Sequence, residues 1–383
     1  MSVTSARGFR AAAVSAGLKS SGGPDLAVIV NDGPRRAAAG VFTTNRCKAN
    51  PVLWSQQALA GGTAQAVVVN SGGANCYTGA AGFAVTHRTA ETVADALGIS
   101  AIDVQVCSTG LIGLLNDADL LVAGAAKAVA ALSTDGGEDA ARAIMTTDSV
   151  PKLAEVEAGG FTVGGIAKGA GMLAPALATM LVFLTTDADV DAATLDEALR
   201  AATAVTFDRL DSDGCMSTND TVLLMASGAS GATPERSQLF DAVRTVCADL
   251  AMQLMRDAEG SEHDITIEVR NAASEEDALE AARSVARSNL FKCAVFGKDA
   301  NWGRVLAALG TTSAAFDPAD LDVSLNGVQV CRASAPAEDP ATVDLEARDV
   351  HVLIDLKAGD ATGSVWTNDL THAYVHENSA YSS

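Results

Sequence analysis

The stretch of sequence that most strongly indicates the fold is residues 163–187, VGGIAKGAGMLAPALATMLVFLTTD. A lysine stands among glycines, a proline follows, and Thr179 then begins an apolar run at 179–186 that predicts a buried strand. Glycine lets the backbone approach itself or a ligand closely, so a tight turn is expected before that strand. Two interpretations are open for Thr179: a core residue whose hydroxyl bonds a neighbouring carbonyl, or a buried hydroxyl that acts as a nucleophile.

Strand and helix patterns alternate on both sides of this stretch, which predicts a mixed α/β fold. Helical spacing of apolar residues occurs at 82–97, 117–132, 194–204, 236–257 and 275–288, and a short helix is expected at 137–145. Strands are predicted at 26–30, 66–69, 104–106, 161–166, 264–270, 321–325 and 349–355. A change in composition at 271–274 predicts a boundary there, with one domain at 1–272 and a smaller one at 273–383.

The composition limits the classes of protein to which the chain can belong. Its 383 residues include 26 Lys and Arg against 47 Asp and Glu, which gives a formal net charge of −21. Nucleic acids and anionic membranes attract basic surfaces, so neither is expected as a partner. Hydrophobic residues make up 48% of the chain and aromatic residues only 4%, so the core should consist mainly of Ala, Val, Leu and Ile.

Cysteine and histidine usage favours a cytoplasmic protein without a metal site. No secretory h-region and no run of 18 apolar residues is recognisable, so neither export nor a membrane span is expected. The seven cysteines are dispersed without a CxxC pair, which is typical of reduced thiols. His372 and His376 could share a helix face, but no third ligand motif lies nearby.

If Thr179 is a nucleophile, its hydroxyl needs a base beside it. A threonine hydroxyl is a poor nucleophile unless a base lies beside it, and the α-amine of a chain-terminal threonine is one such base. The pKa of that amine, roughly 7.7–8.0, suits proton transfer near neutral pH. A threonine inside a chain acquires the amine only if the peptide bond before it is cut.

Other polar segments each allow a functional and a structural interpretation. Residues 107–113 (CSTGLIG) follow a predicted strand, so Thr109 and Gly110 could offer a hydroxyl and an N–H to one oxyanion, or form an ordinary turn. The acidic run at 207–220 lacks EF-hand spacing and is interpreted as a solvated turn. Glu259 would by itself be an exposed acid at the end of a helix.

Taken together, these motifs resemble the ornithine acetyltransferase (glutamate N-acetyltransferase) family of arginine biosynthesis. The resemblance extends nearly end to end, from Gly8 to Ser383. It implies a mixed α/β sandwich as the catalytic domain, of the self-cleaving amidase and ornithine acetyltransferase type, followed by a smaller α/β C-terminal domain. The matching segments are 107–113 (CSTGLIG), 144–148 (IMTTD), 168–181 (KGAGMLAPALATML), 217–221 (STNDT), 257–260 (DAEG), 301–304 (NWGR) and 374–383 (YVHENSAYSS).

The resemblance implies that the chain cuts itself between Ala178 and Thr179. The products would be an α chain of residues 1–178 and a β chain of 179–383, which stay associated and assemble as a heterotetramer. Thr179 would take the acetyl group from N-acetyl-L-ornithine and pass it to L-glutamate, with ping-pong kinetics. No cofactor is implied, and whether acetyl-CoA also serves as an acetyl donor, which would make the enzyme bifunctional, stays open.

The resemblance also assigns roles to single residues. Thr109 and Gly110 match the oxyanion hole. Lys168 suits a substrate carboxylate, whereas Glu259 suits the ammonium group of ornithine, and the opposite charge of the glutamate side chain must be tolerated in the same pocket. Thr147 is an alternative to Thr146. The positions that match substrate-binding residues of the family are Thr146, Lys168, Thr179, Glu259, Asn378 and Ser383.

Departures from the family pattern leave these assignments in place. Residues 261–263 (SEH) replace a small residue, Thr and Lys, so a basic contact there is not expected, and Ser383 replaces a final threonine. Two rival functions remain. A self-cleaving aminopeptidase or amidase would release the acyl group to water, and an uncleaved amino-acid-binding protein would keep Thr179 merely buried.

Overall fold

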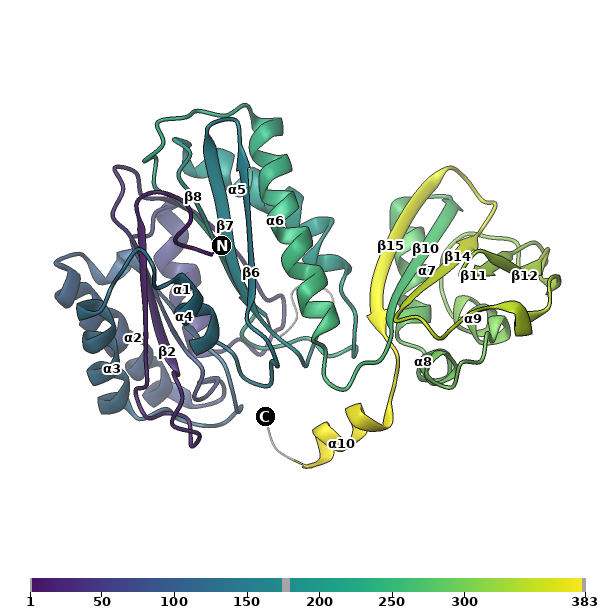
Figure 1. Ribbon diagram of the computed structural model, residues 1–383, viewed down its shortest axis with the longest axis horizontal. Coiled ribbons are helices and arrows are strands. Elements are labelled where there is room, and N and C mark those ends of the chain that lie inside the picture. Colours follow the sequence, from purple (N-terminus) through teal and green to yellow (C-terminus); the bar gives the residue numbers. More distant parts are fainter. Residues whose placement is uncertain (1, 174–179, 381–383) are drawn as a thin grey trace.

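The computed structural model describes residues 2–173 and 180–380. Within those residues the strands form three sheets, two of which face each other as a sandwich while the third lies apart at the C-terminal end (Figure 1). Helices cover the outer faces of the sandwich and one face of the third sheet. The predicted mixed α/β fold is therefore confirmed.

The first sheet has the strand order β1-β2-β4-β5, and β4 and β5 run parallel. Every residue of β2, β4 and β5 is buried, because helices cover one face and the second sheet covers the other. The strands are β1 (Phe9–Val14), β2 (Leu26–Asn31), β4 (Ala66–Asn70) and β5 (Val104–Ser108). The covering helices are α1 (Asn50–Ala58), α2 (Gly79–Leu97) and α3 (Ala118–Ala130).

The second sheet has the order β3-β9-β8-β7-β6. Its inner face packs on the first sheet through Phe9, Ile29, Phe183 and other apolar residues, and α4 (Gly137–Ala143) packs against strands of both sheets. The strands are β3 (Ala37–Phe42), β6 (Lys152–Ala158), β7 (Phe161–Lys168), β8 (Leu181–Thr186) and β9 (Thr221–Ala226). Its outer face is covered by α5 (Ala192–Ala204) and α6 (Arg236–Arg256).

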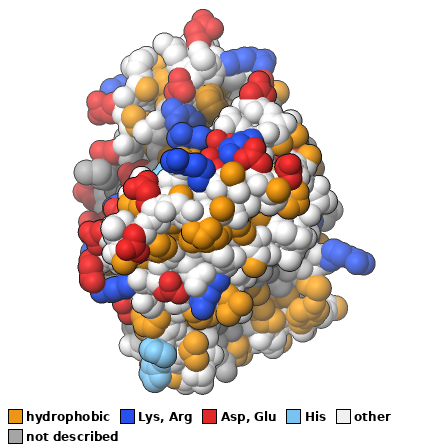
Figure 2. Space-filling model, turned by 90° about the vertical axis from the view of Figure 1, so that its right-hand side faces the viewer, with side chains coloured by type: hydrophobic (Ala, Val, Ile, Leu, Met, Phe, Trp, Pro, Cys, Tyr) orange, Lys and Arg blue, Asp and Glu red, His pale blue; other side chains and the backbone are white. Residues whose placement is uncertain are grey.

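The third sheet has the order β13-β12-β11-β14-β10-β15 and forms its own core with α7 (Glu275–Ala286), α8 (Asn289–Phe296) and α9 (Trp302–Leu309). Its strands are β10 (Asp264–Ala272), β11 (Asp322–Leu325), β12 (Val328–Arg332), β13 (Ala335–Pro336), β14 (Asp349–Asp355) and β15 (Ala361–Asn368). Because β10 pairs with β14 and β15, this sheet begins at Asp264; the division into domains at 272/273 stays a prediction. Figure 2 shows this end of the molecule from outside, with acidic and basic side chains scattered over the surface.

The last helix, α10 (His372–Ala380), runs back from the third sheet toward the sandwich (Figure 1). The Thr371 hydroxyl donates to the Gly260 carbonyl at 2.6 Å and fixes the start of this return. Gly260 has a φ of 61°, and a Cβ there would lie 2.3 Å from the Tyr374 nitrogen, so only glycine fits. None of the helices in the described residues is long and apolar enough to cross a membrane.

Candidate functional site

The parallel strands β4 and β5 end side by side, and the chain after β5 forms one wall of a pocket. The Thr109 N–H donates to the Asn70 carbonyl at 2.9 Å, which ties the two strand ends together. Gly110 has a φ of 121°, and a Cβ there would lie 3.0 Å from the Gly73 nitrogen. The backbone at Thr109 and Gly110 is therefore held in a conformation that requires glycine at the second position.

Lys168 reaches the same wall from the second sheet. It is the last residue of β7, pairs with Leu181 of β8, and is buried. Its Nζ donates to the Thr109 Oγ1 at 3.1 Å, so this contact joins the two sheets of the sandwich. Burial lowers the pKa of Lys168, and the negative charge of Asp148 only partly opposes this shift.

Asp148 organises the turn at 144–148. Its carboxylate accepts hydrogen bonds from Lys152 Nζ at 2.6 Å, from the Gly169 N–H at 2.6 Å and from the Thr146 N–H at 3.0 Å. Burial would raise the pKa of Asp148, but the charges of Lys168 and Lys152 and the Gly169 N–H outweigh it and hold the pKa below its ordinary value. Asp148 lies within the matching segment 144–148 but is not among the predicted site residues.

Glu259 follows α6 and closes the opposite wall. Its N–H donates to the Ala170 carbonyl at 2.9 Å, and its carboxylate lies so close to Gly171 that a Cβ there would be 2.7 Å away. Asn378 of α10 donates from Nδ2 to the Glu259 Oε2 at 3.1 Å. The returning helix thus adds a residue from near the C-terminus to the pocket.

These residues line one cavity of about 190 Å³, which we name the first chamber. It brings together the predicted residues Thr109, Gly110, Thr146, Lys168, Glu259 and Asn378. Thr147 also lines it, so the choice between Thr146 and Thr147 stays open. Three predicted residues, Ala178, Thr179 and Ser383, lie outside the described residues.

The acidic run at 207–220 is not the solvated turn that we expected. Asp211 and Asp220 are 1% and 0% exposed, and Asp213 lines the first chamber. Asp213 accepts hydrogen bonds from the N–H groups of Met172 at 2.6 Å and Cys215 at 3.1 Å. The expectation was wrong because it considered only local polarity. The run packs between the sandwich and the third sheet, and its carboxylates accept hydrogen bonds from backbone N–H groups or, at Asp211, from Arg287.

Two residues of this chamber have strongly shifted pKa values. Burial raises the pKa of Asp213 to about 6, which its backbone hydrogen bonds only partly oppose. Burial, together with the charges of Asp213 and Glu259, raises the pKa of Tyr374 to about 12. Neither residue was predicted; Tyr374 lies in a motif of the resemblance, but no local signal marked its role.

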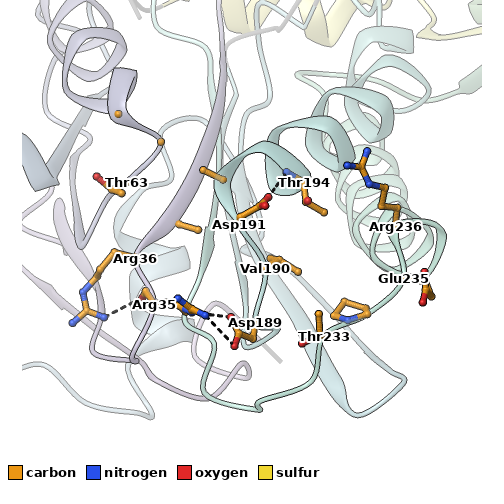
Figure 3. Close-up of a pocket in the computed structure, with 15 residues that line it drawn as sticks. Arg35, Arg36, Thr63, Asp189, Val190, Asp191, Thr194, Thr233, Glu235 and Arg236 are labelled. Atoms are coloured by element: carbon orange, nitrogen blue, oxygen red, sulfur yellow. Dashed lines mark hydrogen bonds and ion pairs between the residues drawn. The ribbon is translucent and has the colours of Figure 1, made fainter.

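A larger cavity, of about 620 Å³, lies beyond the opposite end of β8 and contains none of the predicted site residues (Figure 3). Several of its charged groups are engaged with other groups of the protein. Arg35 Nε donates to Asp189 Oδ1 at 2.8 Å, and Asp191 Oδ1 accepts from the Thr194 N–H at 2.8 Å, capping α5. Among the described residues no cluster of three metal-ligating side chains occurs, and the seven cysteines are free.

The first chamber therefore combines a hydroxyl, a buried lysine and a glycine at positive φ where two sheets of a sandwich meet, an arrangement suited to stabilising an oxyanion in acyl transfer. A family model described as "ArgJ family" matches residues 10–383. The chain belongs to the ArgJ family, so the predicted relationship to acetyltransferases of arginine biosynthesis is confirmed.

Named relatives extend over the whole chain. The chain is 62% identical to an arginine biosynthesis bifunctional protein ArgJ of Streptomyces coelicolor, covering all of both sequences. It is 56% identical to the protein of that name from Mycobacterium leprae, over all of this chain and 96% of the relative. Among solved structures, the bifunctional ArgJ of Bacillus halodurans is 37% identical with a TM-score of 0.50, over 52% of this chain and 98% of that one.

Proposed function

We propose that the protein transfers the acetyl group of N-acetyl-L-ornithine to L-glutamate through an acetyl ester on Thr179. Family membership supports the overall reaction, because relatives that match the whole chain are named proteins of arginine biosynthesis. The observation that carries the proposal is the convergence of Thr109, Lys168 and Glu259 on one buried pocket beside the start of β8. These groups complement an oxyanion, a carboxylate and an ammonium group, respectively.

The nucleophile is generated by self-cleavage. The Thr179 hydroxyl attacks the carbonyl carbon of Ala178, the C–N bond breaks, and the acyl group moves to oxygen as an ester. Water then hydrolyses the ester, which leaves a carboxylate on Ala178 and a free amine and hydroxyl on Thr179. The length of the Bacillus halodurans chain supports this step, since about half of the present chain matches almost all of it.

Acetyl transfer then uses the new amine as the base. The amine takes the proton from the Thr179 hydroxyl as its oxygen attacks the acetyl carbonyl, and the proton passes to the departing nitrogen of ornithine. The oxyanion accepts from the Gly110 N–H and the Thr109 hydroxyl. Because Lys168 donates to the Thr109 oxygen, the hydroxyl proton is left to point at the oxyanion. The amine of glutamate attacks the acetyl ester in the second half-reaction.

Substrate recognition follows from charge. Lys168, with Thr146 or Thr147, binds the α-carboxylate, and Ser383 is a further residue that binds substrate. Glu259, which Asn378 orients at 3.1 Å, binds the side-chain ammonium of N-acetylornithine. No resident cofactor takes part. Acetyl-CoA serves as a second acetyl donor, in keeping with the "bifunctional" name of the relatives.

The fate of the acetyl group tests the proposal against the amidase alternative. Purified protein incubated with N-acetylornithine should release ornithine and form N-acetylglutamate only when glutamate is present. Acetate released at the same rate with and without glutamate would instead indicate a hydrolase. Labelled acetyl-CoA with glutamate tests the second donor, and size-exclusion chromatography with denaturing gels tests whether the two chains remain together as a heterotetramer.

A further inference from the structure

A second chamber of about 270 Å³ adjoins the first. Asp213, Glu259 and Tyr374 line both chambers, so these three residues form the shared wall. The far side of the second chamber comes from α8 and from residues 368–370, which belong to the C-terminal part of the chain. A ligand that reaches past Glu259 therefore enters a space built by the third sheet and its helices.

Lys292 of α8 supplies a buried positive charge to this second chamber. It is 6% exposed, and its Nζ donates to the Ser212 carbonyl and, at 3.4 Å, to the Thr367 hydroxyl. Both acceptors are uncharged, and within residues 2–173 and 180–380 Lys292 forms no ion pair with a carboxylate. A buried lysine is ordinarily paired with an acid, so this arrangement leaves a place for an anion.

The acids near Lys292 are each engaged by other donors. Asp211 accepts from Arg287 Nε at 2.8 Å, and Asp369 accepts from His263 Nδ1 at 2.7 Å. Asp213, as described above, binds two backbone N–H groups. The positive charge of Lys292 thus lacks a dedicated counter-ion. Burial lowers the pKa of Lys292, and the charges of these three acids oppose that shift only in part.

The proposed reaction leaves one electrostatic conflict unresolved. N-acetylornithine carries a positive side-chain end, which Glu259 attracts, whereas glutamate carries a negative end, which Glu259 repels. Both substrates must nevertheless bring their reacting nitrogen to the same acetyl group. A second binding position for the side chain of glutamate, beside a positive charge that offsets the repulsion by Glu259, would remove the conflict.

We propose that the second chamber is the subsite for the side-chain carboxylate of the acceptor amino acid, with Lys292 as its counter-ion. This inference rests on the proposed acetyl transfer to glutamate. The donor keeps its ammonium at Glu259 in the first chamber, while the acceptor extends past Tyr374 and places its carboxylate at Lys292. The two half-reactions then share one nucleophile but use different side-chain subsites.

The test is Lys292→Met, which removes the charge while keeping an unbranched side chain. For the donor half-reaction, intact mass measures how fast N-acetylornithine acetylates the β chain. For the acceptor half-reaction, the acetylated enzyme is mixed with glutamate and the transfer of the acetyl group to glutamate is measured. The KM for glutamate should rise about 10- to 100-fold, as expected for loss of a charge-assisted bond. The donor half-reaction should change less than about threefold. Preference for glutamate over glutamine should fall by a similar factor.

Two further variants keep the test decisive. Lys298→Met removes a surface lysine that pairs with Glu346 and lines neither chamber, so it should change neither half-reaction. Asn289→Asp adds a negative charge to the wall of the second chamber at an exposed position and should raise the KM for glutamate even if Lys292→Met fails to fold.

An unchanged KM for glutamate and an unchanged preference over glutamine in the Lys292→Met enzyme would overturn the subsite. If that variant does not fold, an unchanged KM for glutamate in Asn289→Asp would overturn it. A Lys292→Met enzyme that is slowed only in the donor half-reaction would also overturn the subsite. A wild-type protein that forms no N-acetylglutamate from N-acetylornithine would instead refute the proposed function itself, so the two failures are distinguishable.

Discussion

Lys152 and Lys168 lie near the same end of the paired strands β6 and β7, and both are buried, yet their surroundings differ. Lys152 Nζ lies 2.6 Å from a carboxylate oxygen of Asp148 and 2.6 Å from one of Asp257, and it lines neither chamber. Lys168 donates to the Thr109 hydroxyl and faces the first chamber. Lys152 is enclosed by carboxylates and supports the fold, whereas Lys168 faces a cavity that a ligand can enter.

The largest effect on folding should come from Lys152→Met. This substitution leaves Asp148 and Asp257 buried without their cation, which should cost about 3–5 kcal/mol of the free energy of unfolding. Urea denaturation of the purified variant measures that loss. The KM values of the fraction that remains folded should stay close to those of the wild type. A variant as stable as the wild type would show that Lys152 does not stabilise the fold.

Lys168→Met should show the opposite pattern. The variant loses the donor that orients Thr109 and the positive charge for the substrate carboxylate, so kcat/KM should fall about 10²- to 10³-fold. Its free energy of unfolding should change far less than that of Lys152→Met, because burial already lowers the pKa of Lys168 and its charge is costly to the fold. Steady-state kinetics and denaturation on the same preparation check both expectations. A Lys168→Met variant with a large loss of stability and normal activity would contradict the distinction drawn between Lys168 and Lys152.

Glu259→Gln should separate the two substrates. The variant keeps a hydrogen-bonding side chain but loses the negative charge, so the KM for N-acetylornithine should rise about tenfold while that for glutamate should not. Asn378→Ala serves as the matched control, because it keeps the charge and removes only the 3.1 Å hydrogen bond to Glu259, with a smaller expected effect. Equal losses for both substrates in Glu259→Gln would count against the assigned role.

The smallest effect should be a pH dependence that arises from Asp213. Since its pKa is raised to about 6, Asp213 is neutral below that pH and charged above it. It faces Glu259, Tyr374 and Lys292, and Tyr374, with a pKa raised to about 12, stays neutral over this range. As the pH rises from 5 to 7 the shared wall gains negative charge. The KM for glutamate should then rise and that for N-acetylornithine should fall, each by a few fold.

Asp213→Asn is the control for this pH dependence, because the amide cannot titrate. In that variant neither KM should change near pH 6. Any pH dependence of KM that arises from ionisation of the substrates themselves should remain. The same profile in wild type and variant would assign the titration to another group.

Much of the fold follows from local sequence. The strand predicted at 349–355 is β14, that at 264–270 lies within β10, and the helix predicted at 236–257 is α6 to within one residue. β1 (FRAAAV) and β3 (AAAGVF) were not predicted, because alanine-rich segments have little strand preference of their own. Both become strands through pairing with β2 and β9, which sequence pattern alone does not reveal.

The candidate site likewise contains residues that could be predicted from the sequence and residues that could not. Thr109, Lys168 and Glu259 could be proposed from motifs, and they line one chamber. Lys292 could not, because nothing around it in sequence differs from an ordinary helix and its position beside Glu259 depends on how the third sheet packs against the sandwich. Asp213 was interpreted wrongly because burial and long-range partners, rather than local polarity, decide the state of a carboxyl group.

The most direct measurement is the intact mass of the purified wild-type protein together with N-terminal sequencing of its fragments. We expect two polypeptides, one that ends at Ala178 and one that begins Thr-Met-Leu-Val-Phe, and a single uncut chain for Thr179→Ala. A wild-type protein that remains one chain of 383 residues, or a Thr179→Ala variant that is still cut, would contradict this expectation.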